Sequence, residues 1–465
     1  MDHKQESNKT AGNSIRCRAA VARKAGEPLV IEEVIVAPPR AHEVRIKIIC
    51  TSLCYSDITL WKRNDPGFFP IILGHEAVGV VESVGTSVDE VTEGDIVIPQ
   101  YLAECKKCSV CTSNKSNLCM KFPFEISTWT HRDKTSRFTD LEGKTLHHFL
   151  YILAFSEYTV VDITHLTKLD VSIPPNRACL LSCGVSTGVG AAWRAANVEA
   201  SSTVAIFGLG VIGLAVAEGA RLRGAKKIIG VDVNPEKFEI GKTFGITDFV
   251  DSRNCQDKSI SEVINEMTDG GADYCFECVG LTNLMHEAFS CCRKGWGKTI
   301  VLGVEKSDQE LSLNSLVILH TGKTLMGSLF GGLKPKTDIP ILAESYIQKM
   351  QELQLDEFVT HEMKLEDVNK AFDLLLEGKA CCCHWSCRIC GKLSSVVRLE
   401  MQALKQKITG MKGGLGQFAA TTEDGDGLSG AMVLHKVDTY ESAELKQEYG
   451  DNGGQWYINK KLKKY

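Results

Sequence analysis

Hydrophobic and polar residues alternate in short segments between residue 17 and about residue 183. The segments 44–49 (VRIKII) and 94–101 (GDIVIPQY) have this period of two, and 75–85 (HEAVGVVESVG) is rich in β-branched residues. Such alternation indicates half-buried β-strands, and the Gly and Pro residues between the segments indicate turns. The pattern therefore predicts a small, irregular, mainly-β domain.

A different pattern begins at about residue 185. A buried strand at 202–210 (STVAIFGLG) runs into a glycine turn and a helical stretch, and a second strand follows at 226–233. Strand and helix signals then alternate as far as 298–304 (KTIVLGV). This alternation predicts a doubly wound parallel sheet, so the fold class is α/β with an added mainly-β domain.

The pattern after about residue 327 predicts a return of the chain to the first domain, with a last helix at 368–380 ending near Gly378. Residues 391–465 have weak periodicity and many Gly and Lys, and we expect them to be largely disordered apart from a short helix at 401–408. The expected domains are residues 1–184, 185–327, the return segment 328–380 and an atypical tail, 381–465.

Composition narrows the class of protein. The chain has 465 residues and a formal net charge of -5, which gives no general attraction to nucleic acid or to an anionic membrane. No apolar run approaches the roughly 18 residues of a membrane span, and residues 1–16 lack the apolar core of a secretory signal. The 19 cysteines of so long a chain are better explained as reduced, partly metal-bound thiols than as disulfides. We expect a cytoplasmic protein.

Two groups of residues have the chemistry of zinc ligands. A compact group follows C-x2-C-x2-C-x7-C, typical of a closed structural site, with a disulfide arrangement as the alternative. A dispersed group has only three members, and three protein ligands leave a fourth position open for substrate. The compact group is Cys105, Cys108, Cys111 and Cys119; the dispersed group is Cys54, His75 and Cys183.

The glycine turn GLGVIG contains Gly208, Gly210 and Gly213 between a predicted strand and a predicted helix. These glycines permit a tight turn, close approach of a pyrophosphate and close packing of helix on sheet. Asp232 ends the next strand, 24 residues after Gly208. Its carboxylate would accept hydrogen bonds from a ribose and repel a 2′-phosphate, which favours NAD over NADP. The alternative is a packing cluster of glycines with an N-capping aspartate.

Taken together, these motifs resemble the zinc-dependent medium-chain alcohol dehydrogenases, particularly the classical plant and animal branch. The resemblance covers about residues 17–380 and rests on motifs in family order: CYSDITLW, GHEAVGVVESVG, CKKCSVCTSNKSNLC, TSRFT, SCGVSTGVGAAW, GLGVIG and FGG. It implies a GroES-like catalytic domain interrupted by a Rossmann coenzyme domain, two zinc ions and NAD per subunit, a homodimer, and oxidation of a small alcohol to an aldehyde or ketone.

The resemblance also assigns roles to residues. Cys54, His75 and Cys183 would hold the catalytic zinc, with Asp57 orienting the histidine and Glu76 behind the metal. Ser56 would accept the alcohol proton before hydride passes to the nicotinamide, and Tyr101 would narrow the substrate pocket. The candidate cofactor contacts are Tyr55, Thr187, Gly208, Gly210, Ile212, Gly213, Asp232, Lys237 and Val304.

Three departures from the family pattern stand out. Thr59 replaces a histidine that passes the proton to solvent, and Tyr55 replaces a basic contact to pyrophosphate. Cys382 replaces an arginine that precedes a short final strand, so we expect the closing strand of the catalytic domain to be lost. The segment CCCHWSCRIC allows, as an alternative, a zinc knuckle formed by Cys383, His384, Cys387 and Cys390.

Two other functions compete with alcohol oxidation. The family branch that acts on the glutathione adduct of formaldehyde has an arginine shortly after the fourth structural cysteine. This chain reads CMKFPF at 119–124, although Asp65 lies where that branch also has an acid. The other alternative is a zinc-stabilised pseudoenzyme inactivated by its altered C-terminus. The motifs therefore favour an ordinary alcohol as substrate.

Overall fold

In a computed structural model, the described residues are 10, 12–126, 128–130, 132–169, 173–304, 309–347, 353–379 and 382–386. All described residues belong to one compact unit. The expected disordered tail 391–465 and the short helix at 401–408 therefore lie outside the described residues.

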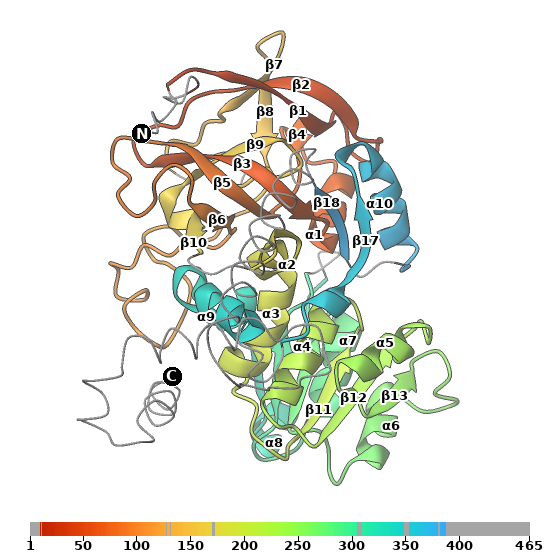
Figure 1. Ribbon diagram of the computed structural model, residues 1–465. Helices are drawn as coiled ribbons and strands as arrows, with labels where there is room; N and C mark the ends of the chain where they lie inside the picture. Colours follow the sequence, from red (N-terminus) through yellow and green to blue (C-terminus); the bar gives the residue numbers. More distant parts are fainter. Residues whose placement is uncertain are drawn as a thin grey trace, which may run out of the picture. The chain divides into compact units, whose positions relative to one another are not determined.

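The first part of the chain forms the mainly-β domain that the alternating pattern predicts (Figure 1). Five of its strands close a barrel in the order β1-β2-β7-β8-β4: Ile15–Ala22, Val30–Val36, Phe138–Asp140, Thr145–His148 and Ile71–Ile72. A second sheet has the order β10-β6-β5-β3-β18-β17, with β9 also paired to β3. Its strands are Leu166–Lys168, Ile96–Pro99, Glu76–Val84, Glu43–Ser52, Cys382–Ser386, Val359–Met363 and, for β9, Tyr158–Asp162.

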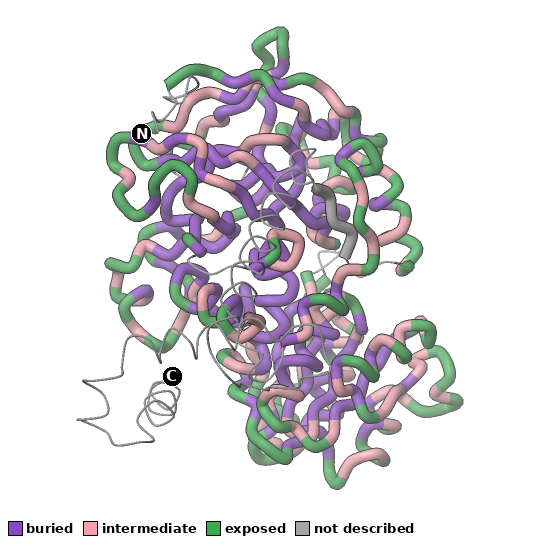
Figure 2. The backbone as a smooth tube through the Cα atoms, viewed as in Figure 1, coloured by how far each residue is buried: buried purple, intermediate pink, exposed green. Residues whose placement is uncertain are grey.

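The middle of the chain forms a six-stranded parallel sheet with the order β13-β12-β11-β14-β15-β16, which confirms the predicted α/β class. Its strands are Asp248–Asp251, Lys227–Asp232, Thr203–Phe207, Tyr274–Glu277, Lys298–Val301 and Thr324–Gly327. The helices between them are α4 Val211–Leu222, α5 Lys237–Thr243, α6 Ile260–Met267, α7 Thr282–Ser290 and α8 Ser315–Thr321. Buried segments run through the strands of both domains (Figure 2).

Other helices connect the domains and carry parts of the site. The α-helices are α1 Tyr55–Lys62, α2 Pro175–Ala178, α3 Gly184–Gly190, α9 Pro335–Ile347 and α10 Val368–Leu376. Other helical turns are η1 Ile163–His165, η2 Cys179–Ser182, η3 Ala191–Ala195, η4 Phe330–Gly332, η5 Asp356–Phe358 and η6 Leu365–Asp367. No helix within the described ranges is long and apolar enough to cross a membrane.

After the parallel sheet, the chain returns to the sheet of the first domain. Strand β17 joins the sheet of the first domain, and α10 ends just before Gly378, whose φ of 69° suits a glycine after a helix. The chain thus passes from the mainly-β domain into the parallel-sheet domain once and returns once. Two crossovers, here meaning connections between the domains, therefore join them.

The expected loss of the closing strand is wrong. Cys382–Ser386 forms β18, which pairs in parallel with β17 and antiparallel with β3. Backbone N–H and C=O groups make these ladder bonds, so a changed side-chain sequence can still fill the position. The start of the expected tail is therefore part of the catalytic-domain sheet. Of the proposed zinc knuckle, Cys387 and Cys390 lie outside the described residues.

Candidate zinc and cofactor sites

The dispersed group of zinc ligands comes together as predicted. Cys54 caps the N-terminus of α1, His75 directly precedes β5, and Cys183 lies between η2 and α3. With Glu76, these residues place one ligand atom each within 4.8 Å of one another. Three turns from distant parts of the chain thus meet at one buried point.

Asp57 organises the ligand His75. One carboxylate oxygen of Asp57 lies 3.3 Å from His75 Nδ1 and accepts a hydrogen bond from the Gly74 N–H at 2.8 Å. The other oxygen accepts from the Cys54 N–H at 3.1 Å. His75 Nε2 is buried and has no hydrogen-bond partner among the described residues. A neutral imidazole whose Nδ1–H faces a carboxylate leaves the Nε2 lone pair for a metal, so the residues fit zinc.

The two thiols of the group are electrostatically coupled. The hydrogen bond from Cys183 holds the pKa of Cys54 well below its usual range, against the effect of burial, and His75 adds to this lowering. The same interaction raises the pKa of Cys183. The pair therefore retains a proton that a bound dication would displace, because metal binding requires both thiolates.

Glu76 lies beside the ligands but is held away by its own hydrogen bonds. One oxygen accepts from the Ser52 hydroxyl and the other accepts from the Gly184 N–H at 2.9 Å. Burial raises the pKa of Glu76 to about 7, and the nearby Cys54 charge adds to this. These contacts tie the strand that follows His75 to the helix that follows Cys183, and the place of Glu76 behind the metal stays a prediction.

The first turn of α1 carries the predicted proton acceptor. Ser56 Oγ lies 3.6 Å from Cys54 Sγ, at the edge of the ligand group. The Thr59 hydroxyl donates to the Tyr55 carbonyl at 3.1 Å, which is a bond within the helix. Tyr55 itself is 43% exposed. Ser56 therefore lies beside a candidate zinc ligand, and its contact with a substrate oxygen stays a prediction, whereas Thr59 adds no titratable group.

An aromatic wall surrounds the histidine ligand. The His75 ring meets Phe149 edge to face with centroids 5.2 Å apart and Tyr101 at 6.2 Å. Phe124 and Phe330 each pack against Tyr101 at 5.6 Å. Tyr101 is the expected pocket residue, but Phe124 and Phe149 lie in loops, where hydrophobic periodicity gives no signal.

The four-cysteine group forms a second, separate site. Its four sulfurs lie within 4.8 Å of one another, and the separations Cys105–Cys111 and Cys108–Cys119 are 3.8 and 4.0 Å. A disulfide bond is about 2.05 Å long, so the disulfide alternative is wrong. A hydrogen bond from the Cys111 N–H lowers the pKa of Cys108 to about 6, which favours a thiolate. Four convergent sulfurs fit a closed zinc site.

The glycine turn between β11 and α4 has the geometry of a dinucleotide site. Gly208 has a φ of 92°, and a side chain at Gly213 would place its Cβ 1.8 Å from the Gly208 carbonyl oxygen. A Cβ at Gly210, in contrast, would meet no atom of the described residues within 4 Å. Gly208 and Gly213 thus allow the turn and the packing, while Gly210 leaves the backbone open to a ligand.

Asp232 lies at the end of β12, next to this turn. Its Oδ2 accepts from the Leu209 N–H at 2.7 Å and lies 3.1 Å from Lys237 Nζ. Of the other expected cofactor contacts, Thr187 is buried in α3, Ile212 is half-buried in the first turn of α4 and Val304 is 54% exposed after β15. Asp232 and Lys237 therefore form one charged pair, and the contacts of all these residues with a cofactor stay predictions.

Known protein families match both parts of this architecture. The family model described as alcohol dehydrogenase GroES-like domain matches residues 40–171, and the model described as zinc-binding dehydrogenase matches residues 211–348. Together they cover the zinc ligands Cys54 and His75, the four-cysteine group and most of the parallel sheet. The class of protein is therefore a zinc-binding dehydrogenase.

Individual relatives narrow the family. The chain is 64% identical over 378 residues to alcohol dehydrogenase-like 7 of Arabidopsis thaliana, covering 81% of this chain and 96% of that protein. It is 50% identical over 371 residues to alcohol dehydrogenase class-3 of Oryza sativa subsp. japonica, covering 79% and 96%. A crystal structure of an alcohol dehydrogenase zinc-binding domain protein from Burkholderia ambifaria matches with a TM-score of 0.74 and 29% identity, covering 80% and 99%. The chain belongs to the zinc-binding medium-chain alcohol dehydrogenase family, in its plant alcohol dehydrogenase-like group.

Proposed function

We propose that this chain transfers hydride between a primary or secondary alcohol and NAD, giving an aldehyde or ketone. The observation that carries the proposal is the buried, unpaired His75 Nε2 beside the Cys54 and Cys183 sulfurs among the described residues. Two thiolates and one imidazole leave an open position on zinc. Zinc, when bound, supplies a Lewis acid that lowers the pKa of an alcohol.

The chain's own residues account for the remaining steps. Ser56, 3.6 Å from the Cys54 sulfur, accepts the alcohol proton before hydride leaves the carbon for the nicotinamide. Asp57 keeps Nδ1 of His75 protonated, so that Nε2 stays a ligand. Since Thr59 cannot titrate near neutral pH, the proton passes from Ser56 to water or to another group.

The aromatic wall favours a small, mainly apolar substrate. Tyr101 and Phe149 pack directly on the His75 ring, so a substrate that reaches the ligand group contacts carbon on these sides. An unbranched or aromatic alcohol gains from burial against such a wall, whereas a charged group near it loses hydration.

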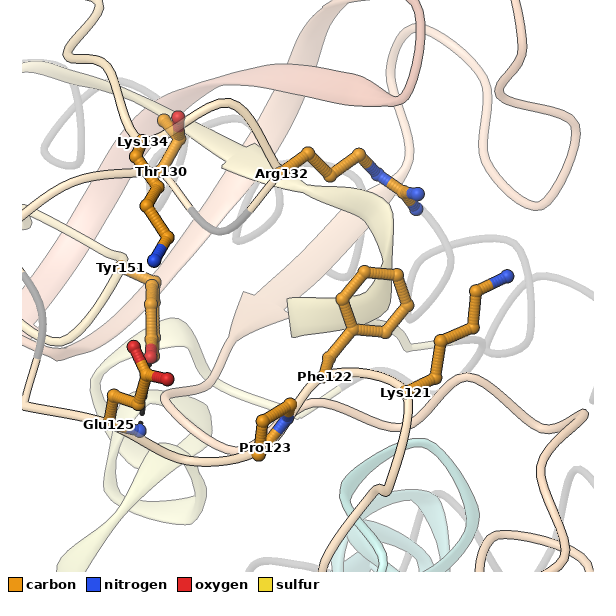
Figure 3. A pocket seen from close by; sticks show the side chains of 8 residues that line it. All are labelled: Lys121, Phe122, Pro123, Glu125, Thr130, Arg132, Lys134 and Tyr151. Carbon is orange, nitrogen blue, oxygen red and sulfur yellow. Dashed lines mark hydrogen bonds between the residues drawn. The ribbon is translucent and has the colours of Figure 1, made fainter.

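A pocket near the four-cysteine group favours the glutathione adduct of formaldehyde as a second candidate substrate. It has a volume of about 420 Å³, and three of its eight lining side chains are cationic: Lys121, Arg132 and Lys134. Figure 3 shows Lys134 and Glu125 reaching toward Tyr151. Glutathione has carboxylates that such cations attract. Arg132 already pairs with Asp162, and Glu125 adds negative charge, so we keep an ordinary alcohol as the first candidate.

NADH production by the purified full-length chain, with a panel of alcohols and with S-(hydroxymethyl)glutathione, tests the proposal. We expect two zinc ions per chain and turnover of alcohols; mild chelation should remove the catalytic ion and activity before the four-cysteine ion. Cys54→Ala should erase turnover and leave NAD binding measurable, since the glycine turn lies in the other domain. A chain that binds zinc and NAD but turns over neither substrate class would be a pseudoenzyme.

We also infer a homodimer and a cytoplasmic location. Strand β16 lies at one edge of the six-stranded sheet, and the helix α8 before it exposes Leu316 and Leu319 at 60% and 74%. An open edge beside exposed apolar side chains is a surface that a second copy of the chain can cover. The location rests on the sequence arguments alone.

A further inference from the structure

The second crossover between the domains is a tight turn with an unusual backbone. Residues 328–334 connect β16 to α9, and three consecutive residues in them have positive φ: Phe330 at 52°, Gly331 at 64° and Gly332 at 77°. Phe330 is not a glycine, so its conformation costs free energy that surrounding contacts must offset. The conformation of this turn therefore depends on contacts with residues outside it.

Some of these contacts come from the lobe that contains the four-cysteine group. The Asn117 side-chain N–H₂ donates to the Leu329 carbonyl at 2.8 Å and to the Leu333 carbonyl at 3.0 Å. Lys334 Nζ donates back to the Cys111 carbonyl at 2.7 Å. Asn117 is only 8% exposed; its bond to Leu333 is buried and its bond to Leu329 is partly buried. One amide nitrogen thus spans the turn from its first residues to its last.

The other side of the turn faces the candidate active site. The Phe330 N–H donates to the Tyr101 hydroxyl at 3.1 Å, and the Tyr101 ring packs on the His75 ring. A side chain at Gly331 would place its Cβ 2.3 Å from the Thr187 carbonyl oxygen, which shows how closely the turn meets α3. A shift of the turn therefore moves Tyr101, which belongs to the aromatic wall, and α3, the helix expected to face the nicotinamide.

We propose that Asn117 is a positioning residue that sets the substrate pocket through the 328–334 turn and Tyr101. The proposal rests on the proposed alcohol dehydrogenase function. Without the Asn117 N–H₂ group, the Leu333 carbonyl loses this donor and the Leu329 carbonyl keeps the Gly332 N–H at 3.0 Å, so the bridge across the turn is lost and the turn relaxes. The Tyr101 hydroxyl then loses its fixed donor, so the wall above His75 is held less firmly.

Steady-state kinetics of Asn117→Ala test the proposal. We expect the KM for the preferred alcohol to rise about tenfold, with kcat within about twofold, because the loss falls on substrate positioning. Asn117→Asp keeps the side-chain volume but removes the two N–H donors. Its KM should therefore rise as in Asn117→Ala. Asn114→Ala is the matched control, since Asn114 is an exposed asparagine of the same lobe, and should leave KM unchanged.

A double-mutant cycle with Tyr101→Phe separates positioning from general destabilisation. If Asn117 acts through the turn and Tyr101, Asn117→Ala should raise KM much less in the Tyr101→Phe background. Strictly additive effects would overturn the proposal. Loss of the four-cysteine zinc from Asn117→Ala would overturn it as well, because the effect would then come from the metal lobe as a whole.

Hydrogen exchange of residues 328–334 gives a readout that needs no turnover. With both zinc ions bound, the Phe330 amide should exchange faster in Asn117→Ala than in wild type or Asn114→Ala, by about tenfold. Unchanged exchange would overturn the proposal. The Phe330 amide can differ in exchange between Asn117→Ala and wild type as expected while wild type oxidises no alcohol. In that case the proposed function fails, and the role of Asn117 in holding the turn stands.

Discussion

At the residue scale, single buried carboxylates organise both candidate sites. Asp57 joins the Gly74 and Cys54 N–H groups to the His75 ring, so one side chain orients two zinc ligands. Burial raises the pKa of Asp57, but the adjacent His75 opposes that shift. Asp232 likewise bridges two groups at the glycine turn, because its carboxylate accepts hydrogen bonds from the Leu209 N–H and from the Lys237 ammonium.

Asp232 carries the prediction on cofactor choice. Asp232→Gly removes the expected ribose acceptor and the repulsion of a 2′-phosphate, and it releases Lys237 from its ion pair. We expect kcat/KM for NAD to fall about tenfold or more, and the NADP to NAD ratio to rise. Asp232→Asn, which keeps an acceptor but not the charge, should shift the ratio less. A wild type that already uses NADP as well as NAD would contradict the role of Asp232.

At the element scale, β18 shows that a strand can form at its position in a sheet even when the side-chain sequence there is unusual. The ladder places His384 opposite Ser52 and Ser386 opposite Cys50, four residues before the zinc ligand Cys54. Strand β3 ends just before that ligand, so β18 supports the strand that leads into the site. The CCHWS segment thus forms the strand between β3 and β17.

Truncation of the chain tests the contribution of β18. A chain ending at residue 380 loses the strand between β3 and β17, which exposes two sheet edges. We expect its Tm to lie at least about 4 °C below that of a chain ending at residue 390. The control is the full-length chain, which should melt together with the 1–390 form if the tail adds nothing to stability. Equal Tm values for the 1–380 and 1–390 chains would show that β18 does not stabilise the domain.

At the scale of the whole molecule, the edge of the parallel sheet predicts the assembly. Leu316 and Leu319 of α8 are exposed and β16 is an edge strand, and we expect a second copy of the chain to cover them. We expect sedimentation to give about twice the chain mass of 51.0 kDa. Leu319→Glu should dissociate the dimer because burying an unpaired charge is costly, whereas Leu376→Glu on α10, also exposed, should not. A monomeric wild type would contradict the inferred dimer.

The sequence by itself determined the two groups of candidate zinc ligands, the glycine turn and the fold class of both domains. These depend on local rules: thiols at C-x2-C spacing can converge on one ion, and a turn with φ near 92° and a 1.8 Å approach requires glycine at Gly208 and Gly213. The four-cysteine group and the glycine turn are each a property of a few neighbouring residues, whereas Cys54, His75 and Cys183 are far apart in the sequence and were grouped through the family resemblance.

Only the tertiary structure decided how distant segments support these sites. The closing strand β18 was expected to be lost, yet backbone pairing with β3 and β17 accepts a changed side-chain sequence. The bonds from Asn117 to Leu329 and Leu333 join residues more than 200 positions apart, and Phe149 meets His75 from a loop. No local period encodes such contacts, because they arise only when packing brings the segments together.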